Sequence, residues 1–189
     1  MADALWFALP VVAAGAMHIA AIRADVLPAL ARMPIDAGLT VRGRRLFGDN
    51  KTLRGLILMP FFTTAMTTAQ TALAGRYDWA RTLTPQALSD AGPVSWGLLL
   101  GLGYVLGELP NSFLKRQIEI APGEAGRGPL GPVFWIVDQV DSLIGALLAI
   151  SLLWMPPWPV VSWLLAITLI VHPLAALAMV SLGLKSRVG

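Results

Sequence analysis

Long apolar runs alternate with short polar segments along the whole chain. Each run has about 20 residues, which is the length that an α-helix needs to cross a bilayer. The pattern predicts an all-α membrane protein with five transmembrane helices and two polar cytoplasmic loops, in a single transmembrane domain over residues 1–189. The predicted spans are about residues 4–22, 55–74, 93–110, 133–154 and 160–182.

Composition supports this class of protein. Hydrophobic residues make up 56% of the chain and charged residues only 13%, whereas about a quarter of the residues in soluble domains are charged. Cysteine is absent, which excludes a disulfide framework, a thiolate metal site and a cysteine nucleophile.

The positions of lysine and arginine predict the orientation in the membrane. Seven lie in residues 23–54, three in residues 111–128 and two in the C-terminal tail, against only Arg76 and Arg81 on the other side. Because basic residues favour the cytoplasmic side, we expect both segments and the C-terminus in the cytoplasm. The N-terminus would then lie outside, in a multi-pass protein of the cell (cytoplasmic) membrane.

Two carboxylates stand inside the fourth predicted span. Asp138 and Asp141 are three residues apart, so they share one face of a helix, together with Ser142 and Gly145. A charge at the bilayer centre costs at least about 2.5–3.5 kcal/mol, and the two carboxylates also repel each other. We therefore expect a divalent cation, or a cluster of lysine and arginine, beside them.

A second polar face is predicted where the third span ends. If the helix continues past Pro110, Glu108, Asn111, Ser112 and Lys115 line one face at positions i, i+3, i+4 and i+7. Arg116 follows directly and adds a second positive charge.

The first polar loop closes on a segment of glycine, small polar and basic residues. Its candidate binding residues are Asp49, Asn50, Lys51, Thr52 and Arg54, between Gly48 and Gly55. Glycines allow close backbone approach, and N–H groups with lysine and arginine can cradle phosphates. Taken alone, the segment fits a basic patch on anionic lipid head groups slightly better.

Together these residues fit phosphoryl or nucleotidyl transfer, which needs a metal, positive charge and positioning more than covalent help from the protein. The two aspartates suit Mg²⁺, and the basic residues suit phosphates: Lys51, Arg54, Lys115 and Arg116. A small cation or proton transporter is the alternative from another class, because intramembrane carboxylates also serve ion pathways.

The run Asn111-Ser112-Phe113-Leu114-Lys115-Arg116, followed by Asp138-Gln139-Val140-Asp141 and Gly145, resembles the signature of the membrane CTP-dependent phosphatidate cytidylyltransferases. The short length, the five spans and the segment from Gly48 to Gly55 are most similar to one branch, CDP-archaeol synthase. CTP-dependent polyprenol or lipid kinases share parts of the pattern.

The resemblance implies transfer of CMP from CTP to a lipid phosphate of the bilayer, giving a CDP-lipid and pyrophosphate. It implies metal binding by Asp138 and Asp141, with Lys115 as a further catalytic residue. It also implies contacts to phosphate from Ser112, Lys115 and Arg116, and from Lys51 and Arg54. No nucleic acid is expected as a partner, and the sequence leaves the oligomeric state and the lipid chains open.

Overall fold

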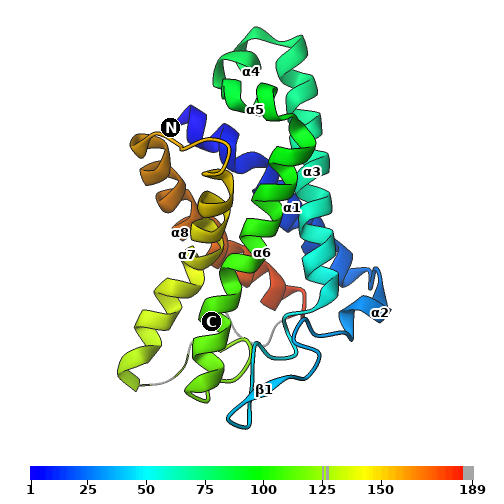
Figure 1. Ribbon diagram of the computed structural model, residues 1–189, viewed down its shortest axis with the longest axis vertical. Coiled ribbons are helices and arrows are strands. Elements are labelled where there is room, and N and C mark those ends of the chain that lie inside the picture. Colours follow the sequence, from blue (N-terminus) through cyan, green and yellow to red (C-terminus); the bar gives the residue numbers. More distant parts are fainter. Residues whose placement is uncertain (125, 127, 185–189) are drawn as a thin grey trace.

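The computed structural model describes residues 1–124, 126 and 128–184, and the chain is mostly helical. Among these residues five helices are long: α1 (Ala2–Arg23), α3 (Leu53–Arg76), α6 (Pro93–Gln117), α7 (Gly131–Ile150) and α8 (Trp158–Ser181). Successive long helices alternate in direction, and α6 packs against both α3 and α7 (Figure 1). The bundle therefore has one end near α4 and α5 and another near β1, called below the upper and lower ends as in Figure 1.

Short elements occupy the two ends of the bundle. Helices α4 (Asp78–Leu83) and α5 (Gln86–Ala91) lie at the upper end, between the second and third predicted spans. At the lower end lie α2 (Pro28–Ala31) and a ribbon of β1 (Thr40–Val41) and β2 (Arg44–Arg45), in which Thr40 pairs with Arg45. The 3-10 helix η1 (Gly128–Leu130) precedes α7. The two basic segments of the sequence thus meet at one end of the bundle.

The predicted class, a helical membrane protein, is confirmed. By length and composition, four of the described helices can cross a membrane: α1, α3, α7 and α8. The predicted third span lies in α6, which has comparable length but carries Glu108, Lys115 and Arg116 near its end. Five membrane crossings therefore stay a prediction. The orientation stays a prediction too, and three of the basic residues on which it rests, Arg127, Lys185 and Arg187, lie outside the described residues.

Helix α6 continues through Pro110 as far as Gln117. Proline inside a membrane helix is tolerated where neighbouring groups satisfy the freed backbone. Pro93 also begins this helix directly after Gly92, which suits the fixed φ of proline at a first helical position. The predicted polar face of residues 108–115 therefore lies on one continuous helix.

The interior of the bundle has an apolar half and a polar half. At the upper end, buried apolar side chains of α1, α5, α6, α7 and α8 form one cluster: Ala4, Phe7, Leu88, Trp96, Leu100, Leu143, Ala146, Ile150 and Leu164. Toward the lower end the buried side chains of α6 and α7 are polar: Asn111, Ser112, Lys115, Arg116, Gln139, Asp141 and Ser142. Polar groups buried in this way need partners, so the lower half is where function is expected.

Glycines allow α6 to lie very close to both neighbours. A Cβ atom on Gly101 would lie 2.4 Å from the Cα atom of Pro60 in α3. On the other side, a Cβ atom on Gly145 of α7 would lie 2.2 Å from the carbonyl oxygen of Gly103 and 2.4 Å from the Cα atom of Gly107. Small residues commonly serve helix contacts in membranes, and here they bring the polar faces of α6 and α7 together.

Candidate active site

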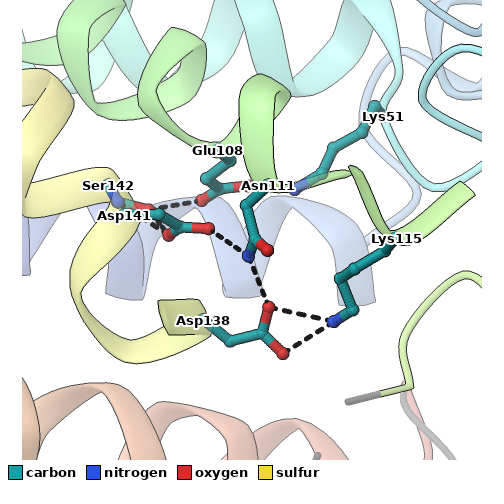
Figure 2. A network of polar contacts seen from close by, with 7 residues as sticks. All are labelled: Lys51, Glu108, Asn111, Lys115, Asp138, Asp141 and Ser142. Atoms are coloured by element: carbon teal, nitrogen blue, oxygen red, sulfur yellow. Dashed lines mark hydrogen bonds and ion pairs between the residues drawn. The ribbon is translucent and has the colours of Figure 1, made fainter. Parts of the chain in front are cut away.

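An amide and two carboxylates join α6 to α7 at the centre of the polar half (Figure 2). The Nδ2 atom of Asn111 donates to Oδ1 of Asp138 at 2.7 Å and to Oδ2 of Asp141 at 2.8 Å. The two carboxylates, one helical turn apart, therefore converge on one point of α6. This confirms that Asp138 and Asp141 share a face of the helix.

Lys115 neutralises one of these carboxylates. Its Nζ atom lies 2.9 Å from Oδ1 and 2.8 Å from Oδ2 of Asp138, and the lysine side chain is buried. The ring of Phe134 lies 6.0 Å from the same ammonium group. Removing one partner of a buried ion pair is costly, and the lysine at Asp138 is one of the two kinds of compensation that the sequence left open, beside a divalent cation.

Glu108 forms a second charged group one turn earlier on α6. Its Oε1 atom accepts a hydrogen bond of 2.8 Å from the hydroxyl of Ser142, and its carboxylate forms an ion pair with Lys51. Desolvation opposes the charge of Lys51, but the nearby carboxylates of Glu108, Asp141 and Asp138 outweigh it and raise the pKa of Lys51. The loop lysine thus stays protonated inside the site.

Arg116 brings a positive charge that forms no ion pair with the described residues. Its side chain is 8% exposed, and within the part of the chain that the structure describes its Nε and Nη1 atoms make no hydrogen bond. Ser112 is buried to the same extent one turn earlier on the helix. A buried guanidinium without hydrogen bonds is costly, so this position is suited to an anionic ligand.

The other loop residues predicted for the site lie around it and not within the carboxylate cluster. Asp49 is exposed and forms an ion pair of 2.7 Å with Arg45. Arg54 forms an ion pair of 3.5 Å with Asp25. Asn50 is exposed, and Thr52 precedes α3 and pairs with Pro34. Their predicted contacts with substrate stay predictions.

Two polar contacts were missed by sequence reasoning. Gln139 lies between the two aspartates on α7, and its Oε1 atom is 3.1 Å from Nδ1 of His172 in α8. Asp36, in the first loop, accepts hydrogen bonds from the N–H groups of Phe47 and Gly48, eleven and twelve residues further on. The signal for Asp36 was its position two residues before Gly38, which is typical of a turn closed by an aspartate side chain.

The carboxylates suit a hard divalent cation only if the substrate completes the coordination. Among the described residues no group of three or more histidine, cysteine, aspartate or glutamate side chains forms a metal site. Mg²⁺, however, is commonly held by one or two carboxylates together with substrate phosphates. Asp138 and Asp141 converge, and Oδ1 of Asn111 is a buried oxygen that accepts no hydrogen bond from the described residues. The donor set therefore fits Mg²⁺ bound with a phosphate ligand.

The fold and this cluster define a multi-pass membrane enzyme. The model of the CarS-like family, CDP-archaeol synthase, matches residues 1–188. The CDP-archaeol synthase of Halobacterium salinarum is 35% identical over 164 residues, 82% of each chain. That of Methanoculleus marisnigri is 31% identical over 161 residues, 80% of this chain and 87% of the relative.

A solved structure has a similar fold. It is that of an intramembrane enzyme for archaeal membrane lipids biosynthesis, with a TM-score of 0.63, 26% sequence identity and 92% of each chain covered. The chain belongs to the CDP-archaeol synthase family. It is accordingly a membrane cytidylyltransferase, which makes a CDP-lipid from CTP and a lipid phosphate. Of the functions considered from the sequence, the family thus supports this one over the kinase and the transporter.

Proposed function

We propose that the triphosphate of CTP binds at the lower end of α6, between Lys115, Arg116 and Lys51. The observation that carries the proposal is the buried guanidinium of Arg116, whose Nε and Nη1 atoms have no partner among the described residues. Phosphate oxygens are the natural acceptors for such a group. The ammonium groups of Lys115 and Lys51 lie against the adjacent carboxylates and supply further positive charge.

The reaction is a direct displacement at phosphorus. An oxygen of the lipid phosphate attacks the α-phosphorus of CTP, the bond to the β-phosphate oxygen breaks, and pyrophosphate leaves. The product keeps the lipid phosphate and the CMP unit joined through a new phosphoanhydride bond. No side chain has to act as a nucleophile, so Lys115 and Arg116 contribute by holding phosphates and stabilising the charge of the leaving group.

Asp138 and Asp141 would hold Mg²⁺, with the carbonyl oxygen of Asn111 as a further ligand. A bound Mg²⁺ would neutralise the triphosphate and favour attack at the α-phosphorus. The ammonium group of Lys115 contacts both oxygens of Asp138. A Mg²⁺ ion held by Asp138 would weaken this ion pair and would leave the ammonium group available to a phosphate.

The lipid substrate is proposed to be a phosphate of the archaeol type. The relatives found across the family are described as CDP-archaeol synthases. Purified protein with CTP and Mg²⁺ is offered ether-linked and ester-linked lipid phosphates, and the products are identified by mass spectrometry. A CDP-lipid from the ether-linked phosphate supports the proposal. A CDP-lipid from the ester-linked phosphate alone contradicts the lipid assignment, and a phosphorylated lipid with CDP indicates a kinase.

The orientation proposed from the basic residues has a direct test. Reporter fusions after residues 127 and 187 should both report the cytoplasm, whereas a fusion after Arg81 should report the exterior. In this proposed orientation, the lower end of the bundle and the cluster between α6 and α7 would face the cytoplasm, where CTP is available. An external signal after residue 127 would contradict this access to the site.

Replacing Lys115 by alanine should lower turnover by roughly a hundredfold, as expected when a group that stabilises developing phosphate charge is removed. Expression should remain, because Asn111 still bonds to Asp138. Initial rates of CDP-lipid formation and yield after purification are the measurements. Arg81→Ala, which removes an exposed charge at the upper end, is the control. Unchanged turnover in the Lys115 variant would instead make this lysine a purely structural partner of Asp138.

A further inference from the structure

A buried carboxylate organises the loop that precedes α3. Asp36 is 3% exposed, and its oxygens accept hydrogen bonds from the backbone N–H groups of Gly38, Phe47 and Gly48 at 3.0, 3.0 and 3.2 Å. The guanidinium of Arg45 binds the same carboxylate at 2.6 Å and 3.3 Å. One side chain therefore closes both the beginning and the end of the segment 38–48.

These contacts fix the charge state of Asp36. Burial raises the pKa of this carboxyl, but Arg45 and the N–H groups of Phe47, Gly38 and Gly48 together outweigh burial. The pKa of Asp36 consequently lies well below its usual range, and the carboxylate is ionised at every pH at which the enzyme would be assayed.

The residues on either side of segment 38–48 pair with each other and place Lys51 in the cluster. The N–H group of Ile35 donates to the carbonyl of Lys51 at 2.8 Å, and that of Leu53 donates to the carbonyl of Met33 at 2.9 Å. These two bonds flank the isolated bridge between Pro34 and Thr52, and they hold residues 33–35 beside residues 51–53. With that pairing set, Lys51 reaches Glu108 on α6.

The same segment also packs against the side chain of Arg116. A Cβ atom on Gly48 would lie 3.6 Å from Cδ of Arg116 and 3.1 Å from Cγ of Pro122. The backbone of Gly48, bonded to Asp36, therefore lies directly beside the buried arginine. Arg44 of the ribbon bonds to the carbonyl of Gln117 and to Glu119, which ties the segment to the end of α6.

We propose that Asp36 is a positioning residue for CTP: it fixes the Phe47–Gly48 backbone beside Arg116 and the loop lysine against α6. The inference rests on the function proposed above, because it assigns the triphosphate to the lower end of α6. Asp36 itself has no free oxygen facing that position, since its carboxylate is occupied by the loop. It acts through the groups that contact the nucleotide.

The test is the variant Asp36→Asn, which keeps the size of the side chain and removes its charge. The KM for CTP should rise about tenfold, the lower end of the effects seen when a group orienting active-site residues is removed. The KM for the lipid phosphate should change by less than about twofold, because the bonds lost lie in the loop and not between the helices. Deuterium uptake at the amides of Phe47 and Gly48 should become faster.

Asp90→Asn is the matched control, since Asp90 is an exposed aspartate on α5 at the upper end and bonds only to Gln86 in the described chain. It should leave both KM values and the uptake at Phe47 and Gly48 unchanged. Arg45→Gln provides a second variant that keeps the three backbone bonds to Asp36. It should raise the KM for CTP more than about twofold, but less than Asp36→Asn does. If Asp36→Asn does not fold, a KM for CTP within about twofold of the wild type in Arg45→Gln would overturn the proposal.

Three results would overturn the proposal: equal rises in both KM values, a KM for CTP within about twofold of the wild type, or unchanged amide exchange at Phe47 and Gly48. The last result removes the positioning role without touching the cytidylyltransferase function. Absence of CDP-lipid formation by the wild-type protein, in contrast, removes the proposed function, whatever the exchange experiment shows about the loop.

Discussion

Asp138→Asn and Asp141→Asn should each reduce CDP-lipid formation by roughly a hundredfold or more. Asparagine keeps the shape of the side chain and removes the charge that would hold Mg²⁺ and offset the triphosphate. Both aspartates bond to Nδ2 of Asn111, so the loss of either one disturbs the same point between α6 and α7. Turnover of CTP against Mg²⁺ concentration is the measurement.

The two variants should differ in heat stability. Asp138 is the partner of the buried Lys115, so Asp138→Asn leaves that ammonium group without its counter-charge and should lower the unfolding midpoint. Asp141 bonds to Asn111 and to the N–H group of Ser142, and the nearby charge of Glu108 repels it. Asp141→Asn should therefore unfold at the same temperature as the wild type or higher, without metal.

Thermal unfolding in detergent, with and without Mg²⁺, measures this difference. Added Mg²⁺ should raise the midpoint of the wild type in the presence of CTP and have a weaker effect on either variant, because a ligand that binds only the folded state stabilises it. Near-normal turnover in both variants would remove the metal role from these aspartates. It would leave the family membership intact and move the metal site elsewhere.

The helical periodicity explains why part of the site was predictable. Residues three and four apart share a helix face, so the sequence alone placed Glu108, Asn111 and Lys115 together and Asp138 beside Asp141. The apolar runs likewise predicted the long helices, although their ends differ: α7 begins at Gly131 and ends at Ile150, before the predicted end at residue 154.

Contacts between helices and within loops were beyond this reasoning. The pairing of Lys115 with Asp138 depends on how closely α6 and α7 approach and on their relative rotation, which no single periodicity encodes. The bonds from Phe47 and Gly48 to Asp36 depend on a turn with no repeating pattern. The ion pair of Arg54 with Asp25 likewise joins two segments that no periodicity relates, and the predicted contact of Arg54 with phosphate stays a prediction.

The close contact between α6 and α7 connects the fold to the chemistry. Asn111 and Lys115 project from one helix, and Asp138 and Asp141 from the other, so their bonds of 2.7–2.9 Å exist only at the present helix separation. That separation is set one to two turns away by Gly103, Gly107 and Gly145. A change at these glycines should therefore affect the site without altering any polar residue.

Gly145→Ala should accordingly weaken both stability and activity. The added Cβ atom would lie 2.2 Å from the carbonyl oxygen of Gly103 and 2.4 Å from the Cα atom of Gly107, which are backbone atoms and cannot rotate away. Overpacking of this kind costs about 1–3 kcal/mol, which corresponds to a fall of roughly 2–12 °C in the unfolding midpoint of a protein of this size. Helices forced apart would also lengthen the bonds from Asn111 to the aspartates and lower turnover.

Gly15→Ala is the matched control for this change. Gly15 also lies inside a long helix, α1, but a Cβ atom there would meet no described atom within 4 Å. Because alanine favours helix by about 1 kcal/mol over glycine, this variant should keep its activity and unfold at the same temperature or slightly higher. Unfolding midpoints and rates of CDP-lipid formation, measured side by side, check both expectations. Equal behaviour of the two variants would show that α6 and α7 can separate without cost, and the link from glycine packing to the site would then be wrong.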